Sequence, residues 1–164
     1  MKHLFKLFML VLPMMFITSC SDDDDSNFPN GETDFTGTTT TYDLMSQSDP
    51  SISGTVTFYQ NKDNSTFAKI NLQGTEDGST YPAHIHFNSA IESGDIAVTL
   101  NPVVGETGFS ETDISTLDDG TAVTYEDLTS FDGYINVHAG PDDLSTLVAQ
   151  GDIGVNILSG QSKS

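Results

Sequence analysis

Short runs in which apolar and polar residues alternate begin at about Thr39 and continue almost to the end of the chain. A period of two puts successive side chains on opposite faces of a β-strand, so each run predicts a strand with one buried face. Clusters of Asn, Asp and Gly, the residues typical of turns, separate the runs. Seven strands are expected, at residues 40–45, 52–60, 66–72, 83–87, 95–100, 133–138 and 148–157.

Helical patterns are nearly absent from the same region, and only two places favour a short helical turn. Thr124 lies three residues before Asp127, a spacing that favours a helix start, and Pro141 after Gly140 occupies a position suited to a first turn. Seven short strands with one or two helical turns predict an all-β fold. We expect an antiparallel Greek-key sandwich or a flattened barrel.

The first 19 residues are typical of a lipoprotein signal peptide. Lys2 and Lys6 precede an apolar run at residues 7–17, which as a helix would cover roughly 16 Å and is too short to span a bilayer. The run ends at Ser19-Cys20, which resembles the bacterial lipobox, and Cys20 is the only cysteine of the chain. We therefore expect Cys20 to carry a lipid anchor rather than a redox or catalytic role.

An acidic segment follows the cysteine. Residues 22–25 are four consecutive aspartates, a self-repelling run that cannot contribute to a packed core. Residues 20–38 are therefore expected to be the lipidated cysteine and a flexible tether, and residues 39–164 the folded domain. Such an acidic run resembles the surface-export signal of Bacteroidetes lipoproteins, which implies an outer-membrane protein exposed at the cell surface. The alternative is a plain polar tether.

Charge and cysteine content exclude several classes of protein. The formal net charge is −19, becoming −21 when Lys2 and Lys6 leave with the signal, and there is no arginine. Phosphate backbones require a Lys/Arg surface, so nucleic acid is not an expected partner. One cysteine also excludes a disulfide framework and a cysteine-rich zinc site within the chain.

Three histidines remain after the signal, and their spacing predicts a metal site. His84 and His86 flank Ile85 on one expected strand, so they share a face and lie about 6.5–7 Å apart at the backbone. His138 ends a second expected strand. Imidazole suits copper, zinc, nickel and iron, and copper(II) binds most tightly in the divalent series. The alternative is that these histidines are ordinary polar surface.

Asp142 is the nearest acidic residue after His138, and two roles are open to it. Its carboxylate could orient a ligand histidine from behind, as acidic partners of metal-bound imidazoles do. Alternatively it serves a turn or a helix start, which its neighbours Gly140 and Pro141 favour.

The region from Ser53 to Asn156 resembles the bacterial chordin-type (CHRD) domains. The recurring features are an Ala-His-Ile-His strand, here residues 83–86, and a Tyr-Val-Asn-Val-His strand, here residues 134–138 with Ile in place of the first Val. A Leu-x-x-Gln-Gly-Asp-Ile-Gly ending at residues 147–154 is shared with Bacteroidetes lipoproteins that carry this domain. The resemblance implies a lipid-anchored protein of the cell envelope.

The same stretch is also similar to a Cu,Zn superoxide dismutase, which implies that His84, His86 and His138 bind one copper ion. The departures are informative: no histidine lies between His86 and His138, and the chain has no arginine. The bridging histidine, the zinc site and the substrate-guiding arginine of that family therefore have no counterpart, and its disulfide cannot form. A strongly negative protein would also repel superoxide. Dismutation is not expected.

Two functions from different classes follow. The first is a non-catalytic, lipid-anchored envelope protein that binds copper through His84, His86 and His138. The second is a surface module that binds a protein or glycan partner and whose histidines are structural. The absence of tryptophan weakens the glycan version, because aromatic platforms favour sugar faces.

Overall fold

Eight strands and one short helix make up the part of the chain that the computed structural model describes, residues 34–47 and 51–157. The segment expected to be a signal peptide, Cys20 and the aspartate run lie outside these residues. In chain order the elements are β1 (Phe35–Ser46), β2 (Ser53–Asn61), β3 (Thr66–Gln73), β4 (Thr80–Phe87), β5 (Ile96–Val104), β6 (Phe109–Ile114), α1 (Tyr125–Thr129), β7 (Asp132–Gly140) and β8 (Asp143–Gly154).

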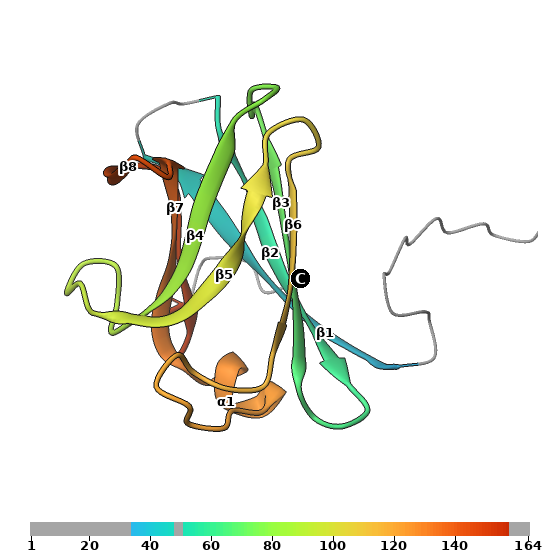
Figure 1. The fold of residues 1–164 in the computed structure, drawn as a ribbon. Coiled ribbons are helices and arrows are strands. Elements are labelled where there is room, and N and C mark those ends of the chain that lie inside the picture. The colour runs from blue at the N-terminus through green and yellow to red at the C-terminus, as the bar shows by residue number, and fades with distance from the viewer. Residues whose placement is uncertain (1–33, 48–50, 158–164) are drawn as a thin grey trace, which may run out of the picture.

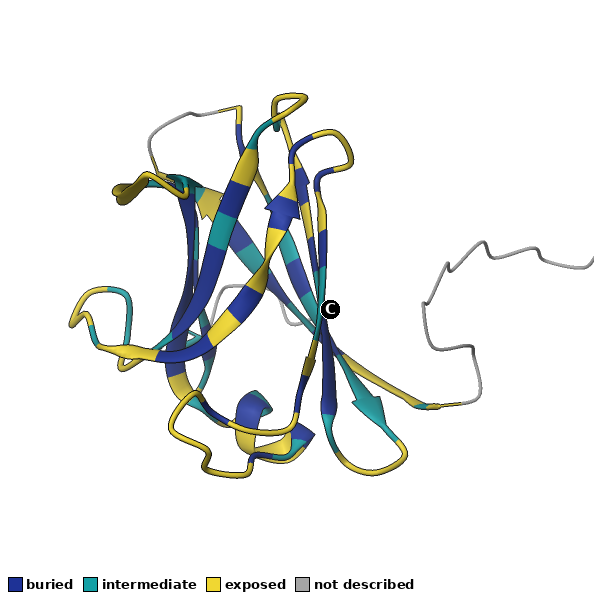
Figure 2. Cartoon of the chain, in the orientation of Figure 1, coloured by how far each residue is buried: buried dark blue, intermediate teal, exposed yellow. Residues whose placement is uncertain are grey.

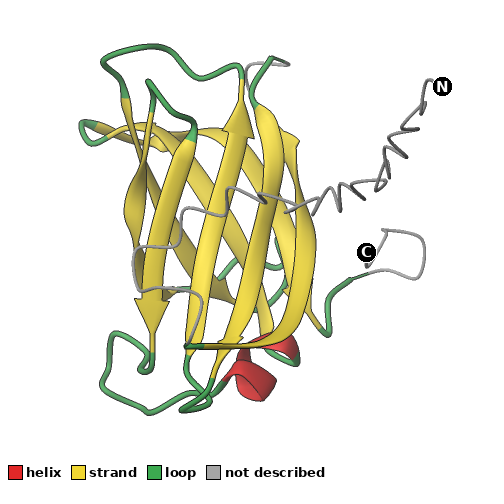
Figure 3. Ribbon diagram, turned by 90° about the vertical axis from the view of Figure 1, so that its right-hand side faces the viewer, coloured by secondary structure: helices red, strands yellow, loops and turns green. Residues whose placement is uncertain are grey.

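The strands form a closed antiparallel barrel in the order β1-β2-β3-β6-β5-β4-β7-β8. Strands β4, β5 and β6 are consecutive neighbours, and β7 returns to pair with β4, which is Greek-key connectivity. Figure 1 shows β4 and β5 side by side in front, with α1 below them, and Figure 3 shows the helix at the same end of the barrel from the side. The all-β Greek-key prediction is confirmed.

Two seams of the barrel are much weaker than the others. Between β5 and β6 only Val104 and Phe109 are paired, and between β1 and β8 only the pairs Met45–Gln150 and Ser46–Ala149 occur. The remaining pairings are long, such as the eight residue pairs that join β2 to β3. The barrel is therefore flattened, with β1-β2-β3-β6 on one side and β5-β4-β7-β8 on the other.

The interior is built from alternate residues of these strands, as the period of two requires. Figure 2 shows buried and exposed positions alternating along the strands. The largest fully buried side chains of this core come from both sides of the barrel and from α1: Leu44, Val56, Phe58, Ile70, Ile85, Val103, Ile114, Leu128, Ile135, Val137 and Ile153. Phe67 is also buried, but it lies outside the core and packs against Phe35 and Tyr59.

The helix was predicted at the correct place. Thr124 accepts a hydrogen bond from the Asp127 backbone N–H, and the Asp127 side chain accepts from the Thr124 backbone N–H. This reciprocal capping satisfies two backbone donors that a helix start would otherwise leave unpaired. Tyr125 and Leu128 are buried, so the helix closes one end of the core.

Three expectations differ from the structure. The prediction of a helical turn at Pro141 was wrong, because β7 and β8 meet there in a tight hairpin in which Gly140 pairs with Asp143. Proline fits this turn because its φ is fixed near the value that turns require. Strand β6 was not predicted, and β1 begins at Phe35, four residues inside the segment expected to be tether.

No described helix is long and apolar enough to cross a membrane.

Candidate functional site

The three histidines lie on the outward side of the barrel wall, on β4 and β7. Their strand neighbours Ile85 and Val137 are fully buried in the core, so alternation turns the histidines away from it. His84 pairs across the strands with Asn136, and His86 pairs with Tyr134. Although they face outward, His84 and His138 are only 8% and 6% exposed, which makes this a buried polar cluster.

One ring nitrogen from each histidine lies within 4.8 Å of those of the other two. The shortest distance joins His84 Nδ1 and His138 Nε2, at 3.1 Å, and the rings of His84 and His86 are perpendicular with centroids 5.9 Å apart. The predicted grouping of these three residues is therefore present in the structure. Two strands supply it: β4 provides two histidines by period-two spacing, and pairing with β7 brings the third.

His86 is held on two sides. Its Nδ1 donates a hydrogen bond to the Gly94 carbonyl at 2.9 Å, and its ring stacks on Tyr134 with centroids 4.9 Å apart and an interplanar angle of 17°. Because a carbonyl only accepts, Nδ1 must carry the proton, which leaves the lone pair on Nε2. That Nε2 is buried and has no hydrogen-bond partner.

The His84–His138 contact needs one donor and one acceptor in the absence of a cation. One of these two ring nitrogens therefore carries a proton and donates a hydrogen bond to the other. The Nδ1 of His138 is buried without a hydrogen bond of normal geometry. The Leu144 backbone interacts with His138, so the buried Nε2 of His86 is the atom of the cluster that lacks any partner. Buried polar atoms without partners are costly, and such an atom beside two other imidazoles is a position that a metal ion could occupy.

Burial keeps two of the imidazoles neutral. Desolvation lowers the pKa of His84, the neighbouring His138 and His86 lower it further, and Asp118 acts against this shift. Desolvation also lowers the pKa of His138, opposed by the Leu144 backbone and by Asp143. The neutral imidazole is the form that binds metals, so both shifts favour a ligand state at neutral pH.

The donor set fits a metal ion. Metal–nitrogen bonds of about 2.0–2.1 Å allow two ligand nitrogens to lie up to about 4 Å apart, a limit that the 3.1 Å pair already meets. The widest separation in the cluster, at most 4.8 Å, requires a side-chain adjustment of about 1 Å. His84 through Nδ1 and His86 and His138 through Nε2 would be the ligands.

Asp142 lies at the exposed tip of the β7–β8 hairpin, and no hydrogen bond joins it to a histidine within the described residues. The carboxylates whose charges act on the cluster are Asp118 and Asp143. Asp118 accepts hydrogen bonds from the backbone and side chain of Thr99, which pairs with His84.

Sequence reasoning missed the residues that support the histidines. Tyr134 shares the outward face with His138, so its position four residues earlier was a usable signal. Gly94 and Asp118 carry no such signal, because they reach the site from loops. An added Cβ on Gly94 would lie 2.0 Å from the Phe87 carbonyl oxygen, so only glycine fits there.

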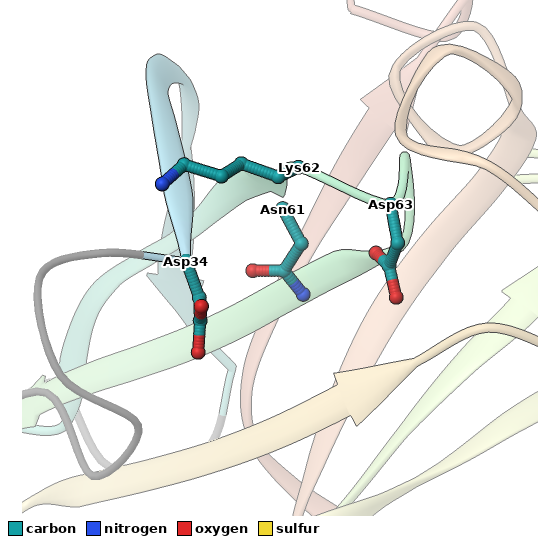
Figure 4. A pocket seen from close by; sticks show the side chains of 4 residues that line it. All are labelled: Asp34, Asn61, Lys62 and Asp63. Atoms are coloured by element: carbon teal, nitrogen blue, oxygen red, sulfur yellow. The ribbon is translucent and has the colours of Figure 1, made fainter.

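A second concave region lies elsewhere, at the β2–β3 hairpin beside the start of β1. It is lined by Asp34, Asn61, Lys62 and Asp63, and Figure 4 shows the Lys62 amine and the Asp63 carboxylate directed apart. This open polar pocket contains no histidine and no buried orphan atom among its lining residues. The three-histidine cluster is the stronger candidate site.

The structure is that of an all-β protein, an eight-stranded Greek-key barrel with three clustered histidines on its outer wall. A family model, the CHRD domain, matches residues 26–141, and the chain belongs to this family. The match contains all three histidines and ends before β8, which completes the barrel. No curated protein and no solved structure matches the chain.

Proposed function

We propose that this protein is a lipid-anchored cell-envelope CHRD-domain protein that binds one copper ion, without catalysis, through His84, His86 and His138. On this proposal it resembles the CHRD lipoproteins of Bacteroidetes. One observation carries the metal proposal: a buried cluster of three ring nitrogens in which His86 Nε2 has a lone pair and no partner.

Copper is the preferred ion because the ligands are all imidazoles. Nitrogen donors without carboxylates disfavour magnesium, calcium and manganese, and copper(II) exceeds nickel and zinc in affinity for such donors. The strongly negative chain, with a net charge of −19, also raises the local concentration of cations. Asp118 and Asp143 add negative charge close to the histidines.

The decisive experiment titrates copper(II) and zinc(II) into residues 21–164 by calorimetry. We expect one copper per chain, tighter than zinc, and loss of stoichiometric binding in His86→Ala. Asp142→Asn is the control: it removes a charge from the exposed tip of the β7–β8 hairpin but no ligand, so we expect an unchanged affinity. The same weak, non-stoichiometric binding in the unsubstituted chain and in His86→Ala would exclude the copper site.

The rival function is a protein- or glycan-binding module with structural histidines. It predicts that His86→Ala lowers the free energy of unfolding while copper has no effect on the unsubstituted chain. The copper proposal predicts instead that copper raises the thermal midpoint of the unsubstituted chain and that His86→Ala abolishes this rise.

The non-catalytic part of the proposal has its own test. Superoxide turnover by the copper-loaded chain should not exceed that of the same concentration of free copper, because no arginine guides the substrate and the charge is repulsive. Turnover clearly above that background would mean a catalytic copper site.

A further inference from the structure

Tyr134 and Gly94, which are not among the three candidate ligands, both contact His86 and form a support for it. We infer that these two residues are positioning residues, which fix His86 in the ring orientation and tautomer that present Nε2 to the ion. This inference deepens the proposed function and rests on it for the ion, but the tautomer itself is a property of the metal-free chain.

The support consists of three contacts that close a ring. His86 Nδ1–H donates to the Gly94 carbonyl, the Gly94 N–H donates to the Tyr134 hydroxyl at 3.3 Å, and the Tyr134 ring stacks on His86. Tyr134 therefore acts on His86 twice, through its ring face and through the loop that carries the Gly94 carbonyl. Each contact constrains a different freedom of the imidazole.

The hydrogen bond decides which nitrogen is free. With Nδ1 protonated, Nε2 is the only ring nitrogen of His86 that can bind a cation, and it is the buried atom without a partner. The stack prevents rotation of the ring about the Cβ–Cγ bond, because rotation would drive it into the tyrosine. Outer partners of this kind orient metal ligands and typically change affinity 10- to 100-fold when they are removed.

The loop geometry shows that the carbonyl is itself fixed. An added Cβ on Gly94 would meet the Phe87 carbonyl oxygen at 2.0 Å, so the loop passes too close to β4 for any other residue. The loop is also tied by Asn88, whose side-chain amide donates to the Ser93 carbonyl at 2.9 Å. Because the Gly94 carbonyl is fixed, it can accept the hydrogen bond from His86 Nδ1 in only one orientation of the imidazole ring.

Two substitutions separate the contributions of Tyr134. Tyr134→Phe keeps the ring stack and removes the hydroxyl that accepts from the loop, whereas Tyr134→Leu removes both. Tyr81→Phe is the matched control, because Tyr81 is a buried tyrosine whose hydroxyl also accepts from a loop backbone N–H, that of Glu76 at 3.0 Å.

The first readout is nitrogen-15 NMR of the imidazoles in metal-free residues 21–164, where only three histidines contribute. We expect a protonated Nδ1 and an unprotonated Nε2 for His86 in the unsubstituted chain and in Tyr81→Phe. Tyr134→Leu should shift His86 toward a mixture of tautomers, and Tyr134→Phe should give a smaller shift. A His86 protonated at Nε2 in the unsubstituted chain would overturn the inference.

The second readout is copper(II), by affinity and by the nitrogen couplings of its electron paramagnetic resonance spectrum. We expect Tyr134→Leu to weaken binding 10- to 100-fold and to alter the couplings, and Tyr134→Phe to weaken it less. If both Tyr134 variants lose stability yet keep the tautomer and the spectrum, Tyr134 is merely structural and the inference fails. If the predicted tautomer is found but copper does not bind, the copper site fails and the positioning of His86 stands.

Discussion

Individual buried hydroxyls in this barrel differ sharply in how well they are satisfied. Thr40 and Tyr125 share a buried hydrogen bond of 2.7 Å, whereas the hydroxyls of Tyr42 and Thr66 are buried without a partner. Burial raises the pKa of Tyr42 to about 12, because its environment disfavours the phenolate. Buried hydroxyls of the same residue type are therefore expected to contribute differently to the free energy of unfolding.

Two tyrosine-to-phenylalanine substitutions test this difference. Tyr42→Phe removes a hydroxyl that has no hydrogen bond of normal geometry and only a weaker interaction with the Gly154 backbone, so we expect little change in the free energy of unfolding in urea. Tyr125→Phe leaves the buried Thr40 hydroxyl unpaired and should cost about 1 kcal/mol or more. Equal losses in the two variants would contradict the assignment.

The histidines predict an acid-sensitive metal-free protein. Burial is the main cause that lowers the pKa of both His84 and His138 below the ordinary value of 6.5. Below that value the unfolded chain binds protons that the folded chain resists, so the free energy of unfolding falls as the pH drops through and below 6.5. Above it, the stability is fully present.

Urea denaturation with a chelator present, at steps from pH 7.5 to about pH 5, measures this dependence. The exposed aspartates of lowered pKa, such as Asp63 and Asp127, titrate from 3.8 downward and lie outside this window. The double variant His84→Gln, His138→Gln should flatten the slope. If the free energy of unfolding of the double variant still falls between pH 7.5 and about pH 5, groups other than these two histidines cause the pH dependence.

At the scale of elements, the weak β1–β8 seam leaves no room for a side chain at one of its glycines. Gly151 on β8 lies against β1, and an added Cβ there would be 2.1 Å from the Asp43 carbonyl oxygen. This backbone atom cannot move without displacing the strand that closes the barrel. In the described residues that closure is held by two residue pairs and by a hydrogen bond from the Gln47 backbone N–H to the Val148 carbonyl.

Gly151→Ala should therefore lower the free energy of unfolding by about 2 kcal/mol or more. Gly140→Ala is the matched control, since an added Cβ there meets nothing within 4 Å. We expect it to be neutral or slightly stabilising, because alanine restricts the unfolded chain. Thermal or urea unfolding of both variants gives the comparison, and equal effects would refute the role of the seam.

Strand β6 shows why part of the fold was not predictable. Its inward positions include Ser110 and Ile114, and it carries Glu111 and Asp113, so no apolar alternation is present. Its place is set by partners instead: it pairs with β3 over six residue pairs, including Lys69 with Glu111, whose charges are 3.3 Å apart. Tertiary pairing overrides a weak local pattern there.

Strands β4 and β5 extend past the predicted bounds, because each contains a proline, a residue that usually argues against a strand. Pro82 and Pro102 lie within these strands, at a register shift where Tyr81 pairs with Val103 and Ala83 with Leu100. Proline is tolerated in a strand at such a bulge. The histidines were predictable because their strands alternate regularly, whereas Gly94 and Asp118 depend on loops whose course no local pattern specifies.

At the scale of the whole molecule, the signal segment and Cys20 predict an envelope protein attached by lipid. The charge of −21 that remains without Lys2 and Lys6 would keep such a domain soluble beside the membrane. A single cysteine makes the test direct, because no other thiol competes for acylation.

Cys20→Ser in the full chain, expressed in a bacterium that processes lipoproteins, should abolish labelling by a radioactive fatty acid. The protein should also move from the membrane fraction to the soluble fraction, since acyl chains supply the membrane affinity. Ser19→Ala is a control that changes the neighbouring residue but not the acylated atom. Membrane retention of Cys20→Ser would point to a different means of attachment.

The placement of the histidines has an evolutionary consequence. His84 and His86 are alternate residues of β4, and His138 follows Val137 on β7; the inward neighbours Ile85 and Val137 are fully buried. Selection can act on one set without changing the other, so a descendant could exchange imidazoles for other ligands, or discard them, while inheriting the same interior. Among CHRD domains, the outward positions other than these recurring histidines should therefore vary most, while the inner residues change only among apolar types.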